Sequence, residues 1–105
     1  MAWIYLAVAG LLEIVFAYGL KTAAGFTRLW PSVLTVVAAA ASLYLLSRAL
    51  RTIPIGTGYA VWTGIGAAGT AIVGMMVLGE SRSAARLASI VLILVGVIGL
   101  RVFAD

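Results

Sequence analysis

The sequence predicts an all-α integral membrane protein, a bundle of four transmembrane helices in one domain spanning residues 1–105. The chain is 65% hydrophobic and 10% charged, and its mean hydropathy is +1.23. So few charges cannot cover a water-exposed surface, which excludes an ordinary soluble domain. Four apolar runs are each long enough for a helix to cross a hydrocarbon layer about 30 Å thick. The expected spans are residues 2–20, 30–50, 53–78 and 84–103.

The composition also excludes several classes of function. Cys and His are both absent, so disulfides, the usual zinc sites, imidazole acid–base chemistry and thiol nucleophiles are not available. We therefore expect no enzyme, no metal and no cofactor. The net charge of +4 comes from seven Lys and Arg residues that lie near the ends of the apolar runs, where they mark membrane boundaries. That placement argues against a nucleic-acid partner.

The first span contains a single charged side chain, Glu13, close to its middle. An ionised carboxylate at that depth costs at least about 2.5 to 3.5 kcal/mol and usually marks a functional site. No Lys or Arg occupies the centre of another span, so the chain offers Glu13 no charged partner. Gly10, Phe16 and two alanines share its helical face and leave room for a ligand. The alternative is a structural Glu13, hydrogen-bonded to a neighbouring helix. Because Glu13 also interrupts the only stretch that resembles a cleaved leader, we expect the first helix to be retained.

The second span begins near Pro31, which suits the first turn of a helix, and contains a small-residue patch at residues 38–42. Ser42 adds a hydroxyl to this patch. It could face a pocket or bond a carbonyl of its own helix. The connection at residues 51–54 is so short that the second and third spans must be antiparallel neighbours.

The third span is rich in glycine and carries Tyr59, Trp62, Thr63 and Gly66 at i, i+3, i+4 and i+7. This spacing puts two aromatic rings and a hydroxyl on one helical face. Gly64 and Gly66 lie near the centre of the span, where glycine pairs permit bending as well as close packing. We predict a conformational hinge at these two glycines, with close packing as the plainer interpretation.

The fourth span carries a seam of small residues, Ser89, Gly96 and Gly99, which we predict to pack against a second copy of the chain. With four spans, both termini and the second connection lie on one side of the membrane. Each side then carries nearly the same number of cationic side chains: Arg48, Arg51 and Arg101 against Lys21, Arg28, Arg82 and Arg86. The positive-inside bias is nearly absent, so we expect insertion in both orientations and an antiparallel, dual-topology homodimer.

Three stretches, residues 10–13, 25–32 and 54–66, resemble the small multidrug resistance family of proton-coupled exporters, and the glycine-containing fourth helix extends the likeness over essentially the whole chain. Residues 62–66, 78–81 and 86–89 are most similar to its guanidinium-exporter subtype. The resemblance implies a multi-pass protein of the bacterial inner membrane that forms an antiparallel homodimer.

The resemblance also implies a shared site for protons and substrate at Glu13, lined by Tyr59 and Trp62, with Ser42 as a hydrogen-bond partner. A carboxylate that binds either a proton or an organic cation makes the two compete, and this competition is the basis of antiport. Phe16 departs from the subtype, which usually has Trp there, so the site lacks one indole N–H. We predict a guanidinium exporter. A broader exporter of quaternary ammonium cations and a non-transporting membrane scaffold remain the alternatives.

Overall fold

The computed structural model describes residues 1–103 and contains four α-helices: α1 (Ala2–Thr22), α2 (Leu29–Ala49), α3 (Ile55–Val77) and α4 (Ala84–Val102). Each helix is long and apolar enough to cross a membrane. The predicted all-α fold with four membrane helices is thus confirmed. The third helix begins at Ile55, later than the predicted residue 53, because Pro54 is extended (φ −56°, ψ 142°) and caps the helix. Ile53 therefore lies in the turn, where its side chain is buried.

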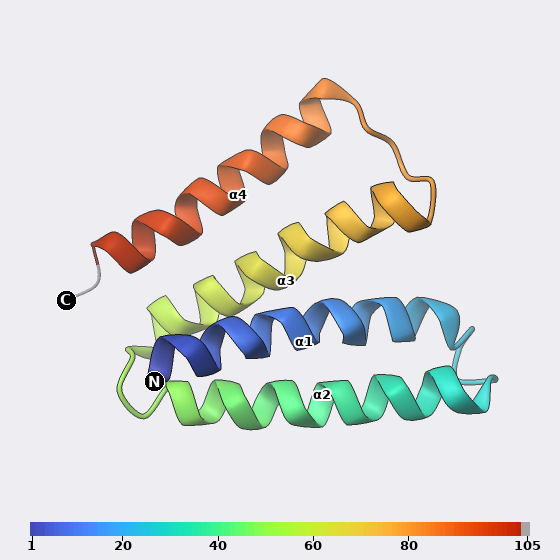
Figure 1. The fold of residues 1–105 in the computed structure, drawn as a ribbon, viewed down its shortest axis with the longest axis horizontal. Helices are drawn as coiled ribbons and strands as arrows, with labels where there is room; N and C mark the ends of the chain where they lie inside the picture. The colour runs from blue at the N-terminus through green and yellow to red at the C-terminus, as the bar shows by residue number, and fades with distance from the viewer. Residues whose placement is uncertain (104–105) are drawn as a thin grey trace.

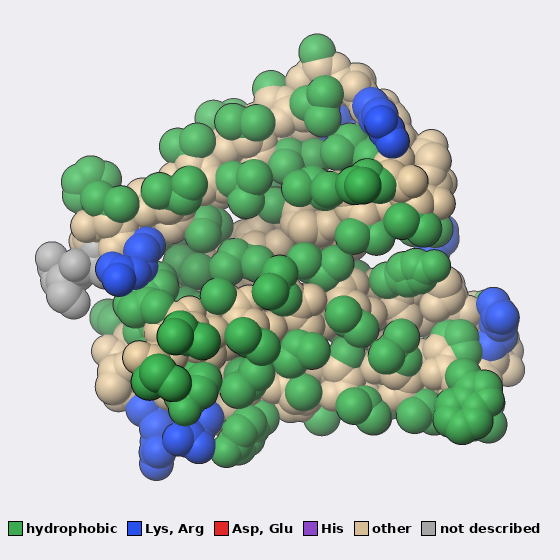
Figure 2. All heavy atoms as spheres, viewed as in Figure 1, with side chains coloured by type: hydrophobic (Ala, Val, Ile, Leu, Met, Phe, Trp, Pro, Cys, Tyr) green, Lys and Arg blue, Asp and Glu red, His purple; other side chains and the backbone are tan. Residues whose placement is uncertain are grey.

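The helices form a three-helix core to which the fourth helix is attached on one side (Figure 1). α1 packs against both α2 and α3. α4 packs mainly against α3, and its contact with α1 includes the Arg101 guanidinium, which lies 4.8 Å from the centre of the Trp3 ring. The connections at residues 23–28 and 78–83 lie at one end of the molecule, opposite the start of α1. Figure 2 shows hydrophobic side chains over the whole length of the visible face, with Lys and Arg toward the ends of the helices.

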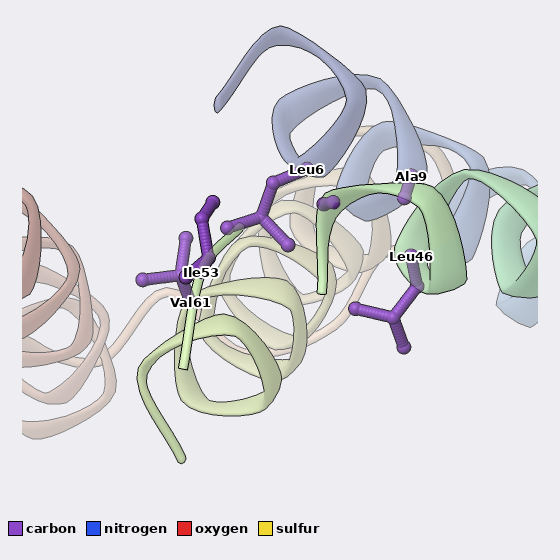
Figure 3. Close-up of a cluster of buried hydrophobic side chains, with 6 residues drawn as sticks. Leu6, Ala9, Leu46, Ile53 and Val61 are labelled. Atoms are coloured by element: carbon purple, nitrogen blue, oxygen red, sulfur yellow. The ribbon is translucent and has the colours of Figure 1, made fainter. Parts of the chain in front are cut away.

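The largest buried cluster joins α1, α2 and α3 at the end where α1 begins (Figure 3). It consists of Leu6, Ala9, Leu46, Ala49, Ile53 and Val61. Toward the other end, α1 and α2 approach closely because Gly19 lies against Thr35: a Cβ at Gly19 would be 2.6 Å from the Thr35 hydroxyl oxygen. That hydroxyl donates to the Pro31 carbonyl at 2.7 Å. The contacts place α1 at the centre of the core.

The fourth helix is the least buried of the four. Ile90 is its one buried residue, Val97 is half-buried against α3, and most of its other apolar side chains are exposed. A Cβ at Gly96 or Gly99 would meet no atom within 4 Å, and the exposed Ser89 hydroxyl donates to the Ala85 carbonyl of its own helix at 2.8 Å. The predicted small-residue seam is thus unoccupied by any other part of residues 1–103.

Candidate functional site

The candidate site is a cavity of about 550 Å³ bordered by α1, α3, the segment that joins α3 to α4, and the first turn of α4. We call it the Glu13 cavity. Its lining residues are Glu13, Phe16 and Ala17 from α1; Tyr59, Trp62, Thr63, Gly66, Ala67, Thr70 and Ala71 from α3; and Glu80 and Arg86. Two carboxylates, one guanidinium group, three aromatic rings and two threonine hydroxyls therefore surround a space large enough for a small organic cation.

Two glycines bring α1 and α3 together at the level of Glu13. A Cβ at Gly10 would lie 2.8 Å from Cβ of Ile65, and a Cβ at Gly66 would lie 2.9 Å from Cβ of Glu13. Both distances are too short for real side-chain carbons, so only glycine fits at either position. Gly66 thus lines the cavity and sets the helix separation, whereas Gly10 packs against α3 beside the cavity.

The carboxylate of Glu13 is partly exposed to the cavity. Within residues 1–103, no hydrogen bond or ion pair reaches its oxygens. The indole N–H of Trp62, which also lines the cavity, is donated to the Ser42 hydroxyl and not to Glu13. The side chain therefore faces a cavity with all of its acceptor capacity free for a ligand or a proton.

Ser42 connects the three core helices behind this site. Its buried hydroxyl donates to the Ala9 carbonyl of α1 at 2.8 Å and accepts the indole N–H of Trp62 from α3 at 2.9 Å. In an α-helix the Ala9 carbonyl also accepts the backbone N–H of Glu13, four residues later. Ser42 thus fixes the turn that carries Glu13 and holds the Trp62 ring, but it lies outside the cavity lining.

The aromatic side chains form one wall of the cavity. The rings of Tyr59 and Trp62 are tilted by 53° with their centroids 5.3 Å apart, within the range of favourable aromatic pairs. Phe16 contributes a third ring from α1. Such faces attract organic cations, and the attraction strengthens where water is excluded.

The structure brings together six of the residues predicted for the site or the hinge: Glu13, Phe16, Tyr59, Trp62, Thr63 and Gly66. Gly64 lies elsewhere, toward α4, where a Cβ would be 2.5 Å from a methyl carbon of Val97. Close packing thus accounts for both predicted hinge glycines in this conformation.

Sequence reasoning missed Thr70, Glu80 and Arg86. Thr70 continues the helical face of Gly66 one turn further along α3, so periodicity could have indicated it. Glu80 and Arg86 reach the cavity because the chain turns back at Gly79, whose φ is +69°, and the backbone N–H of Glu80 then bonds the Gly74 carbonyl at 3.0 Å. Residues 1–103 contain no cluster of acidic side chains that could hold a metal ion.

Comparison with known proteins places this site in a family. The family model described as "Small Multidrug Resistance protein" matches residues 1–93. Among curated proteins, the chain is 60% identical over 101 residues to a guanidinium exporter of Yersinia pestis, covering 96% of this chain and 97% of that protein. It is 59% identical to a guanidinium exporter of Citrobacter freundii over 96% of both chains. A guanidinium exporter of Salmonella typhimurium strain LT2 is 57% identical over 99% of both chains.

These matches cover nearly the full length of the chain and include every described residue of the Glu13 cavity. They agree with the four apolar helices of the fold. The chain therefore belongs to the small multidrug resistance family, a family of multi-pass bacterial membrane transporters, and it is not an enzyme.

Proposed function

We propose that this protein exports guanidinium or small guanidinyl cations in exchange for protons, and that the two ligands compete for Glu13. The observation that carries the proposal is a carboxylate within the membrane span that no described residue neutralises and that faces a cavity of about 550 Å³. The guanidinium exporters with which the chain shares 57 to 60% identity support the choice of substrate.

Competition between a proton and a cation for one carboxylate is sufficient to couple cation export to proton import. A free carboxylate within the membrane span is unfavourable, so the site is occupied by a proton or by a cation in its stable states. If the protein reorients only when Glu13 is occupied, each cation that leaves is exchanged for protons that enter. The membrane potential contributes about 2.3 kcal/mol per net charge moved per 100 mV.

We further propose that two copies function as an antiparallel homodimer. The nearly equal distribution of Lys and Arg on the two sides favours insertion in both orientations. The open seam of Ser89, Gly96 and Gly99 on α4 offers a surface on which a second copy can pack closely. A tag fused to the C-terminus should be accessible from both sides of the membrane. Accessibility from one side alone would contradict this arrangement.

The guanidinium proposal is tested by transport in proteoliposomes. An outward guanidinium gradient should drive protons into the vesicles through wild-type protein and not through Glu13→Gln, which keeps the size of the side chain but cannot ionise. Gly56→Ala serves as the matched control, since a Cβ there meets no atom within 4 Å. Wild-type vesicles without guanidinium-driven proton movement would refute the proposal. If tetraalkylammonium moved no protons either, a non-transporting scaffold would be favoured.

A broader exporter of quaternary ammonium cations is the second candidate, and Phe16 is the observation that favours it. The cavity presents three aromatic rings, while the one indole N–H among them is donated to Ser42. Aromatic faces bind a tetraalkylammonium ion well, whereas guanidinium gains more from forked hydrogen bonds to a carboxylate. Proton movement driven by tetraalkylammonium but not by guanidinium would establish this alternative.

A further inference from the structure

Two carboxylates, not one, line the Glu13 cavity, and they lie along a single face of α3. Gly66 contacts the Glu13 side chain, and Gly74 lies against the Glu80 carboxylate, so tightly that a Cβ at Gly74 would overlap its oxygens. Eight residues separate these glycines, which corresponds to about 12 Å along the helix axis. Thr70 lies midway on the same face, one turn from each glycine, and lines the cavity between the two acids.

The Glu80 carboxylate is occupied by a guanidinium group of the protein itself. Nη2 of Arg86 donates to Oε1 of Glu80 at 2.6 Å, while the buried Nε of Arg86 has no hydrogen-bond partner. The contact is therefore single, not the forked pairing that an arginine and a carboxylate can form. Arg82 does not compete for the acid, because its guanidinium donates to the Met75 carbonyl at the end of α3.

This ion pair has the properties of a contact that a ligand can replace. The side chains of Arg86 and Glu80 are 33% and 44% exposed, and exposed pairs contribute little to stability. Arg86 also lies in the first turn of α4, where the N-terminal end of the helix dipole disfavours a positive charge. A free guanidinium ion carries the same planar donor group without these restraints and can bind both carboxylate oxygens.

We propose that Glu80 is a second cation-binding carboxylate, at the mouth of the Glu13 cavity, and that Arg86 occupies it when no cation is present. An incoming guanidinium ion displaces the Arg86 guanidinium from Glu80 and then passes along Thr70 to Glu13. Arg86 is thus an internal competitor that keeps the outer carboxylate neutralised between transport cycles. The inference rests on the proposed guanidinium transport and adds an outer site to it.

Opposite effects of two substitutions distinguish this role from a structural one. Both Glu80→Gln and Arg86→Gln break the ion pair, so a pair that only fastens the loop predicts that they impair transport alike. Displacement predicts that Glu80→Gln raises KM for guanidinium and that Arg86→Gln lowers it. From the strength of exposed pairs, we expect each change to be about two- to fivefold. In the double variant, KM should equal that of Glu80→Gln, because Arg86 acts through Glu80.

Initial rates of guanidinium-driven proton movement in proteoliposomes measure these constants. Changes of KM in the same direction for both single variants would overturn the proposal. So would an Arg86→Gln effect that persists undiminished in the Glu80→Gln background, since Arg86 would then act on the cation through its own charge. If wild-type protein moves no protons with guanidinium, the proposed function fails first, and that outcome is distinct from either of these.

A binding measurement that leaves Glu80 intact completes the test. Carbodiimide labels accessible carboxylates, and peptide mass spectrometry reports the labelling of Glu80 separately from that of Glu13. In the Glu13→Gln protein, guanidinium should still slow the labelling of Glu80 relative to sodium at the same ionic strength. Equal labelling in the two salts would show that guanidinium does not bind Glu80 in preference to sodium and would overturn the proposal even if the Glu80 variants could not be purified.

Discussion

Replacing Gly66 by alanine tests whether the contact between α1 and α3 sets the geometry of the Glu13 cavity. The added Cβ would lie 2.9 Å from Cβ and 3.6 Å from Cγ of Glu13, whereas carbon atoms in good contact are about 3.5 to 4.0 Å apart. Cβ of Glu13 is attached directly to the α1 backbone, so no change of rotamer can move it away. The two helices must separate by up to about 1 Å, and overpacking of this kind costs about 1 to 3 kcal/mol.

Gly56→Ala is the matched control. Gly56 lies in the same helix, and a Cβ there meets no atom within 4 Å. The gain in intrinsic helix propensity, about 1 kcal/mol in the interior of a water-soluble helix, is at least as large at Gly66 as at Gly56, which lies in the first turn of α3. It therefore cannot explain a lower stability of Gly66→Ala, which would report the contact with Glu13.

The free energy of unfolding can be measured in mixed micelles by titration with a denaturing detergent and followed by tryptophan fluorescence, to which Trp62 at the site contributes. We expect Gly66→Ala to be less stable than Gly56→Ala by about 1 to 3 kcal/mol and to transport guanidinium more slowly. Equal unfolding curves for the two variants would refute the packing argument. Loss of transport with unchanged stability would instead support the hinge predicted for Gly66.

Two further predictions concern the hydrogen bonds around the site. Ser42→Ala leaves the indole N–H of Trp62 without its acceptor and should cost about 1 to 3 kcal/mol of stability. Adding Trp62→Phe to the Ser42→Ala protein should cost little more. Additive losses in this double-mutant cycle would contradict an energetic coupling between Ser42 and Trp62. Phe16→Trp places an indole N–H one turn from Glu13 and should raise the preference for guanidinium over tetraalkylammonium in competition transport assays. An unchanged preference would show that this position does not determine selectivity.

The membrane helices were predictable because their signal is strong and local. Hydropathy and length identify a span without reference to any tertiary contact. The predicted start of the third span at residue 53 overlooked the restricted backbone of Pro54, after which α3 begins. The connection at residues 23–28 was not predictable in the same way. Ala24 and Phe26 both have positive φ, 49° and 65°, which non-glycine residues rarely adopt. Hydrogen bonds to the Ala23 carbonyl from two later backbone N–H groups accompany this conformation.

The helical face of the site was also predictable, but the partners of its polar groups were not. Tyr59, Trp62, Thr63 and Gly66 share a face by periodicity alone, and all four line the cavity. For Ser42, the sequence left open a pocket or its own helix, whereas the hydroxyl bonds a carbonyl of α1. That choice depends on the angle and separation of α1 and α2, which the small-residue patch permits but does not specify.

The bond from Trp62 to Ser42 has a consequence for how protons and cations exchange at the site. A tryptophan that donated to Glu13 would take up part of the acceptor capacity of its carboxylate. In this conformation the indole N–H is instead donated to Ser42, and no hydrogen bond or ion pair from residues 1–103 reaches the Glu13 carboxylate. What binds the Glu13 carboxylate therefore depends on which ligand enters the cavity, and in our proposal the ion pair of Arg86 and Glu80 controls that entry. Charge stabilisation at the centre and access at the mouth therefore depend on separate groups, which substitutions can perturb independently.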